Sequence, residues 1–216
     1  MNKLTPNDLL EEMIEHARLD NFIQGVWIDD GKGCMWGCTM QTETDAIEKA
    51  CELYQIPKWL GFLAEAIFEG LDIEDAKSWP VDCIKAFGEY EGDVERIKHE
   101  LAILRLTPLA ANNTSVSDAI NGVIDCHKKF LASDLDIDWT SACEAAYSAA
   151  SSAAYSAASS AAYSAAESAA AADSAAQSAG YVAAYSAAWS ADSGGSSEPW
   201  RLEADNLLKF LRKGSK

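Results

Sequence analysis

Basic residues are scarce in this sequence, and their scarcity excludes the usual nucleic-acid-binding proteins. The 216 residues include 17 Lys and Arg against 34 Asp and Glu, which gives a formal net charge of −17 and an isoelectric point near 4.4. A protein that binds DNA or RNA needs a basic face to neutralise phosphates, and adhesion to an anionic membrane needs one too. We therefore expect neither nucleic acid nor a membrane among its partners.

Long apolar runs and a secretion signal are also missing. No run of about 18 apolar residues occurs outside an Ala- and Ser-rich tract at 141–192, and Ser recurs too often in that tract for a membrane span. The cysteines lack the density and spacing of a disulfide framework. They are Cys34, Cys38, Cys51, Cys83, Cys126 and Cys143. The sequence predicts a soluble, cytoplasmic protein with reduced thiols.

Helical spacing of apolar residues predicts an all-α fold, in one compact multi-helix domain. Thr5 with Pro6 is typical of a helix start, as is Asp72 later in the chain. Pro80 is expected to kink or restart the helix that contains it, and Pro108 is expected to end its helix. Residues 22–28 are compatible with a short strand or an extended lead-in, and a final amphipathic helix is expected at 198–213.

The last third of the chain repeats the pattern S-A-A-x. Alanine is the best helix former, but four residues turn an α-helix through about 400°, so the serine row drifts by about 40° per repeat. One continuous helix of this tract would reach about 78 Å, well beyond a compact domain. We expect a broken helical region, interrupted near Asp173 and Ser174 or at Gly180. The repeated serines are Ser148, Ser152, Ser156, Ser160, Ser164 and Ser168.

Three parts of the chain follow from these patterns. Residues 1–132 form the helical N-terminal part, 133–192 the Ala/Ser-repeat helices packed on it, and 193–216 a linker with the last helix. No Lys or Arg occurs between Lys129 and Arg201, so this stretch carries a negative potential. Such a surface would suit an acidic decoy that binds a basic host protein. The alternative is that the charge only keeps an Ala-rich helix soluble.

The segment 24–38 has the most unusual composition and is the candidate ligand site. It combines four glycines, two thiols, two tryptophans and one lysine. Glycines let backbone N–H groups approach a ligand, a lysine supplies positive charge, and tryptophans can stack on a base. The alternative is a tight turn with two buried cysteines. The candidate ligand-binding residues are Gln24, Trp27, Gly31, Lys32, Gly33, Cys34, Trp36 and Cys38.

Neither a metal centre nor a catalytic group is completed by sequence spacing. Cys34 and Cys38 would share a helix face, with His16, His99 or Cys51 as further ligands, but structural zinc sites usually contain a second tight pair. Cys126 and His127 are neighbours whose side chains point about 100° apart on a helix, and His127 falls on an apolar stripe. We expect no metal, no cofactor and no catalytic residue. A thiol- or metal-dependent enzyme is an alternative.

The glycine- and cysteine-containing segment also carries a family resemblance. The pattern Gln24-Gly25…Gly31-Lys32-Gly33-Cys34…Gly37-Cys38 resembles a segment of uncharacterised phage and prophage proteins that end in SAAY or SAAW repeats. The similarity covers about residues 16–90 and the repeat. It continues in Ile56-Pro57-Lys58-Trp59-Leu60, in Ile67-Phe68-Glu69-Gly70-Leu71, in Ala76 and in Trp79-Pro80.

The resemblance implies a mobile-element origin, and accessory proteins of such elements often interfere with host defences. It implies no catalytic residue. Because no catalytic constellation is complete, we expect a phage-type accessory binding protein that sequesters a small, nucleotide-type signalling molecule in the host cytoplasm. The partner is then a small-molecule ligand or, in the decoy alternative, a host defence protein. The oligomeric state is left open, with a homo-oligomer compatible.

Overall fold

The protein, seen here as a computed structural model, is all-α. The structure describes residues 4–42, 45–134, 136–152, 161, 165, 166, 168 and 197–214. Within these residues there is no strand, and the only β-type pairing consists of two isolated bridges, Phe22 with Gly33 and Asp29 with Lys32. The predicted fold class is confirmed. None of the described helices is both long enough and apolar enough to cross a membrane.

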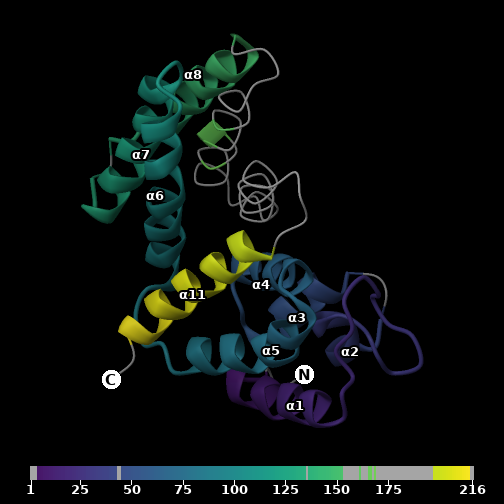
Figure 1. Cartoon of the computed structure of the whole chain (residues 1–216). Helices are drawn as coiled ribbons and strands as arrows, with labels where there is room; N and C mark the ends of the chain where they lie inside the picture. The colour runs from purple at the N-terminus through teal and green to yellow at the C-terminus, as the bar shows by residue number, and fades with distance from the viewer. Residues whose placement is uncertain are drawn as a thin grey trace. The chain divides into compact units, whose positions relative to one another are not determined.

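The chain divides into two compact units (Figure 1). The first unit contains residues 1–94 and 196–216, and the second contains residues 95–195. The helices of the first unit are α1 (Pro6–Arg18), α2 (Met35–Met40), α3 (Ala46–Tyr54), α4 (Lys58–Gly70), α5 (Ile73–Gly88) and α11 (Glu198–Lys213). Those of the second are α6 (Val94–Asn112), α7 (Ser117–Leu131) and α8 (Trp139–Ser152). The boundaries predicted at 132/133 and 192/193 stay a prediction.

Side-chain caps set the helix starts that the sequence predicts. The Thr5 hydroxyl accepts a hydrogen bond from the Asp8 backbone N–H, while the Asp8 carboxylate accepts one from the Thr5 N–H at 2.6 Å. Asp72 caps α5 by accepting from the Asp75 N–H at 3.1 Å. These bonds satisfy donors that a helix N-terminus otherwise leaves unpaired, which is why α1 and α5 begin at Pro6 and Ile73.

The expectation that Pro108 ends its helix is wrong, and α5 does not restart at Pro80, whereas a kink there stays a prediction. Helix α5 continues through Pro80, and α6 continues through Pro108 to Asn112. A proline inside a helix costs about 3 kcal/mol, so packing must offset it. In α5 the adjacent Trp79 is buried, and its indole N–H donates to the Ala64 carbonyl of α4 at 2.9 Å. This contact between helices holds the turn that the proline weakens.

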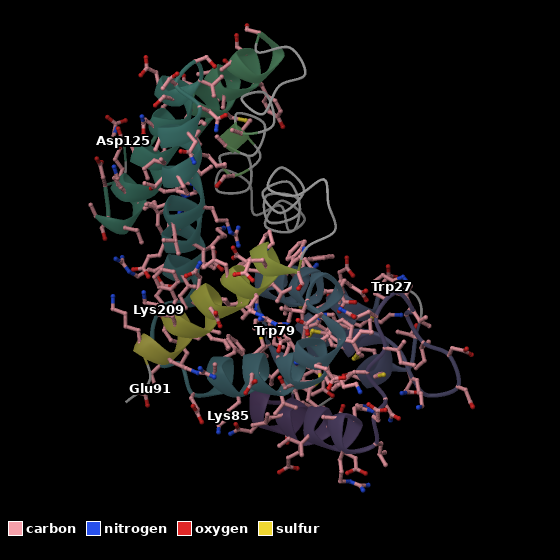
Figure 2. All side chains as sticks on the ribbon, in the orientation of Figure 1. Trp27, Trp79, Lys85, Glu91, Asp125 and Lys209 are labelled. Atoms are coloured by element: carbon pink, nitrogen blue, oxygen red, sulfur yellow. The ribbon has the colours of Figure 1, made fainter. Side chains whose placement is uncertain are left out.

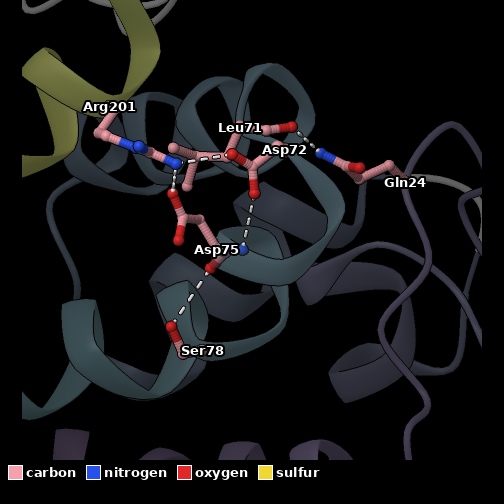
Figure 3. A network of polar contacts seen from close by, with 6 residues as sticks. All are labelled: Gln24, Leu71, Asp72, Asp75, Ser78 and Arg201. Atoms are coloured by element: carbon pink, nitrogen blue, oxygen red, sulfur yellow. Dashed lines mark hydrogen bonds and ion pairs between the residues drawn. The ribbon is translucent and has the colours of Figure 1, made fainter. Parts of the chain in front are cut away.

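Helix α11 packs against α4 and α5 and has the bounds that the sequence predicts. Trp200 lies directly over Gly70, where an added Cβ would meet the indole at 2.2 Å. Arg201 forms ion pairs with Asp72, at 2.7 Å, and with Asp75 (Figure 3). The last helix is therefore fastened at the junction between α4 and α5.

The second unit is built around aliphatic side chains of α6 and α7. Trp139 of α8 and alanines of the Ser/Ala tract complete its core, because their small side chains let helices approach closely. The predicted interruption at Asp173, Ser174 or Gly180 lies outside the described residues. The buried core residues are Leu106, Ala110, Val116, Ile120, Val123, Ile124, Cys126, Trp139, Ala146, Ala161, Ala165 and Ala166.

Candidate functional site

The segment between α1 and α2 is a loop folded back on itself by backbone hydrogen bonds. Ile23 donates to the Gly33 carbonyl at 2.8 Å, and Gly33 donates to the Asn21 carbonyl at 2.9 Å. A Cβ at Gly33 or at Gly37 would lie only 2.1 Å or 1.6 Å from the Trp27 carbonyl oxygen. The two glycines thus let the Trp27 backbone pack against the start of α2, and their role is close approach within the protein.

A tight turn forms the tip of this loop, as the sequence predicts. The Asp29 N–H donates to the Lys32 carbonyl at 2.6 Å, and the Lys32 N–H donates back to Asp29 at 2.9 Å. Gly31 has a φ of +77°, in the left-handed region that favours glycine. The Lys32 and Trp27 side chains are both exposed, and Trp27 lies at the outer edge of its unit (Figure 2).

Gln24 fastens the start of the loop to the end of α4. Its side-chain amide donates to the Phe68 carbonyl at 2.6 Å. It also donates to the Leu71 carbonyl at 2.8 Å (Figure 3). These carbonyls belong to the helix terminus, where no further turn supplies partners. Gln24, one of the predicted ligand-binding residues, therefore holds the loop in position against α4.

The remaining predicted site residues lie inside the protein. Trp36 is fully buried, and its indole N–H donates to the Gly61 carbonyl at 3.0 Å, so it offers no face on which a ligand can stack. The buried Cys38 thiol donates to the carbonyls of Asn21 and Gly33 at 3.3 and 3.4 Å. Burial raises the pKa of Cys38 to about 11, so it is a neutral thiol that holds the loop backbone.

Two carboxylates of α4 approach Cys34, which gives the loop a polar centre. Single ligand atoms of Cys34, Glu65 and Glu69 all lie within 4.8 Å of one another. Glu65 and Glu69 are four residues apart and so lie on one face of α4. Cys34 caps α2, where its sulfur accepts from the Gly37 N–H at 3.3 Å. Glu69 accepts from the Gly25 N–H at 2.7 Å, so the loop backbone also contacts this centre.

Glu65 is the unusual member of this group. Its side chain is 5% exposed, and its Oε2 has no hydrogen-bond partner among the described residues. Burial raises the pKa of Glu65 to about 8, and hydrogen bonds with the Cys34 thiol and the Trp36 backbone only partly oppose this rise. Burial also raises the pKa of Cys34, and the neighbouring Glu65 raises it further. At neutral pH the centre therefore holds protons that a positive ligand would displace.

Sequence reasoning missed both glutamates, although a signal for Glu65 exists. It is the only charged residue in the ten-residue apolar run from Trp59 to Phe68. A lone carboxylate within a buried helix is costly unless something compensates its charge, so such a residue marks a candidate site. Its proximity to Cys34 depends on how the loop folds over α4, and no spacing along the chain encodes that.

A second buried polar group lies in the second unit. His99 of α6 and His127 of α7 share a hydrogen bond between their Nδ1 atoms at 2.8 Å, and His127 Nε2 lies 2.9 Å from the Ser168 hydroxyl. The His99 ring stacks on Phe130 with ring centroids 3.7 Å apart. Trp139 packs against the rings of both His99 and His127. His127 is buried, as its place on an apolar stripe of the sequence indicates.

This histidine pair is arranged for structure and not for nucleophilic catalysis. Burial lowers the pKa of both imidazoles, and the nearby Lys98 lowers both further. A general base must become a cation during the reaction, and this environment disfavours the cation. Ser168 is itself buried. The chain of hydrogen bonds links α6, α7 and the Ser/Ala tract.

Comparison with known proteins assigns no family to the chain. No protein-family model, no curated protein and no solved structure matches it. The resemblance to phage and prophage proteins therefore stays a prediction. What the chain does must be argued from its own residues.

Proposed function

We propose that this protein is a binding protein that retains a small, positively charged ligand at Cys34, Glu65 and Glu69 without converting it chemically. The observation that carries the proposal is the buried Glu65 carboxyl, whose Oε2 has no partner among the described residues. An unpaired polar atom in a protein interior typically costs about 1–3 kcal/mol. A ligand that brings positive charge removes this cost, and the low dielectric of the interior strengthens the attraction.

Retention is favoured over turnover by the state of the thiol. A catalytic cysteine acts as a thiolate and sits in electropositive surroundings that lower its pKa. Cys34 has the opposite environment, because burial and the carboxyl of Glu65 raise its pKa. The same carboxylates attract a cation, so the surroundings that suppress nucleophilic attack support binding.

A nucleotide ligand, as predicted from the sequence, is the second candidate, and the exposed Trp27 favours it. Its indole is 47% exposed, and Lys32 on the same loop is exposed as well. Stacking of a base on such a ring contributes about 1–3 kcal/mol. The phosphates would have to stay away from Glu65 and Glu69, so this ligand would lie on the outer face of the loop. Sequestration of a signalling molecule for a phage rests on the resemblance alone.

Thermal stabilisation separates the two candidates. We would measure the melting temperature with divalent metal ions, organic amines and guanidines, and nucleotides. The main proposal expects cations to raise it in the wild type and in Glu74→Gln, whose side chain is 84% exposed, but not in Glu65→Gln. The second candidate expects nucleotides to raise it, with loss of the effect in Trp27→Ala and Lys32→Ala. Equal stabilisation of the wild type and Glu65→Gln by cations would contradict the main proposal.

A further inference from the structure

We infer that the ligand is a divalent metal ion of the zinc class, coordinated by the Cys34 sulfur and by the carboxylates of Glu65 and Glu69. The inference rests on the proposed function and names the ligand of the same site. It departs from the sequence analysis, which expects no metal because Cys34 and Cys38 lack a second pair. In the structure the partners of Cys34 are carboxylates of α4, while Cys38 is hydrogen-bonded to the loop carbonyls.

The spacing of the ligand atoms suits one ion. Zinc lies about 2.3 Å from a cysteine sulfur and about 2.0–2.2 Å from a carboxylate oxygen, so tetrahedral ligands are about 3.3–3.7 Å apart. The atoms of Cys34, Glu65 and Glu69 lie within 4.8 Å of one another, so they would have to move closer together to coordinate one ion.

A separate observation points to a ligand at this place. Acidic residues and a thiol often cluster without binding anything, but the Glu65 side chain is only 5% exposed and its Oε2 lacks a partner among the described residues. Burying a carboxylate oxygen without a partner is costly. Coordination of a metal ion would give this buried carboxyl a partner.

The donor types select among metal ions. A cysteine thiolate is a soft ligand that favours zinc and similar transition metals, whereas calcium and magnesium take hard oxygen ligands in larger number. The Gly37 N–H already donates to the Cys34 sulfur and lowers the pKa of the thiol, which supports the thiolate once a metal replaces the proton. Hydrogen bonds of this kind behind a metal ligand orient it and stabilise its charge.

Glu69 is the exposed member of the centre. Cys34 and Glu65 are buried, whereas Glu69 is exposed and accepts from the loop at Gly25. A metal ion would meet Glu69 first and then displace protons from the two buried ligands. Metal binding by protonated ligands releases protons into the solvent.

Zinc titration of the metal-free, full-length protein tests the inference. Calorimetry should detect one zinc ion per chain, with calcium and magnesium binding far more weakly. Cobalt in place of zinc should give the charge-transfer absorption of a metal–thiolate bond. Glu65→Gln and Cys34→Ser should each weaken zinc binding by at least about a hundredfold, since even loss of a residue behind a metal ligand costs 10–100-fold. Glu74→Gln and Cys143→Ser are the matched controls and should bind as the wild type does.

The outcomes of this experiment distinguish an error in the metal ion from an error in the binding site. Tight zinc binding that is equal in the wild type and Glu65→Gln would assign the ion to surface carboxylates and overturn the inference. If zinc does not bind but an organic cation stabilises the wild type and not Glu65→Gln, the metal is wrong and the proposed function stands. If no cation binds in a manner that depends on Glu65, both are wrong. Glu65→Gln replaces a neutral carboxyl by a similar amide, so the variant is expected to fold.

Discussion

Glu65 carries a proton in the ligand-free protein through most of the neutral range, because burial raises the pKa of its carboxyl to about 8. Its ordinary pKa, near 4.5, applies to the unfolded chain. The folded state therefore binds more protons than the unfolded state between these two values. A carboxyl of this kind stabilises the fold fully below about pH 4.5, and this contribution is lost as the pH rises through about 8.

Replacing Glu65 by glutamine should flatten this pH dependence. We expect Glu65→Gln to resemble the wild type at pH 5 and to be more stable at pH 8.5, on the order of a few kcal/mol, because the amide never ionises. Urea unfolding followed by circular dichroism at the two pH values measures the effect. Glu74→Gln, on the exposed side of α5, is the control. If the free energy of unfolding changed equally between pH 5 and pH 8.5 in the wild type and in Glu65→Gln, Glu65 would not be buried as described.

Gly37, a buried glycine of α2 that lies against the loop, differs from a glycine on a helix surface. A Cβ at Gly37 would overlap the Trp27 carbonyl at 1.6 Å, whereas a Cβ at Gly122 in α7 meets nothing within 4 Å. We expect Gly37→Ala to destabilise the protein by about 3 kcal/mol or more, because backbone must move to admit it. Gly122→Ala should instead stabilise it by up to about 1 kcal/mol through helix propensity. Denaturant unfolding of both variants gives the comparison, and similar effects of the two changes would contradict the described loop.

At the scale of elements, α11 is held by packing more than by its ion pairs. The side chains of Arg201, Asp72 and Asp75 are 43–48% exposed, and solvent-exposed ion pairs of this kind contribute little to stability. Gly70→Ala would push its new methyl group into the Trp200 ring, which lies 2.2 Å from the added Cβ. We expect Gly70→Ala to destabilise the docking of α11 by about 1–3 kcal/mol and Arg201→Ala by less.

Hydrogen exchange of the α11 amides measures how firmly this helix is docked on α4 and α5. Exchange should accelerate clearly in Gly70→Ala and only slightly in Arg201→Ala. Leu202→Ala, at a side chain that is 61% exposed, serves as the neutral control. A larger effect of Arg201→Ala than of Gly70→Ala would show that the ion pairs dominate.

The histidine pair should make α6 and α7 sensitive to mild acid. Burial lowers the pKa of His99 and of His127, and the cations Lys98, Arg96 and Arg105 act in the same direction. The unfolded chain therefore binds more protons below about pH 6.5, and the stability from these neutral imidazoles is lost as the pH falls below that value. If both rings were protonated, two N–H groups would also face each other across the 2.8 Å contact between their Nδ1 atoms.

We expect the amides of α6 and α7 to lose protection between pH 7 and pH 5, after correction for intrinsic exchange rates. The double variant His99→Leu and His127→Leu should lose this dependence, because it has no imidazole in that core. His16→Gln, a change in the first unit, should retain it. Equal protection at pH 5 and pH 7 in the wild type would mean that the pair is not buried in its neutral form.

Local chemistry made the starts of α1 and α5 predictable, whereas the course of α5 through Pro80 depends on tertiary contacts. Thr5 with Asp8 and Asp72 with Asp75 satisfy backbone donors of their own helix, so sequence alone suffices there. The continuation through Pro80 depends on a neighbouring helix, because Trp79 is held by the Ala64 carbonyl. The glycines of the segment 24–38 made the loop predictable from the sequence. Its buried polar centre was not predictable in this way, because Glu65 lies 31 positions after Cys34 in the sequence.

For the whole molecule, the acidic charge favours the same ligand class as the local site. A formal net charge of −17 attracts cations and repels phosphates. At physiological salt this attraction acts over a screening length of about 8 Å from the surface. A nucleotide ligand would have to overcome this field, while a metal ion would be drawn in by it. The composition that first excluded nucleic acids thus agrees with a cation at Glu65.

The location of a bound metal ion tests the central claim most directly. Crystals grown with zinc, measured at the zinc absorption edge, reveal the ion by its anomalous scattering. The account predicts a strong peak about 2.3 Å from the Cys34 sulfur and about 2.0–2.2 Å from carboxylate oxygens of Glu65 and Glu69. A zinc peak only at exposed carboxylates or at His16, with none beside Cys34 and Glu65, would contradict it.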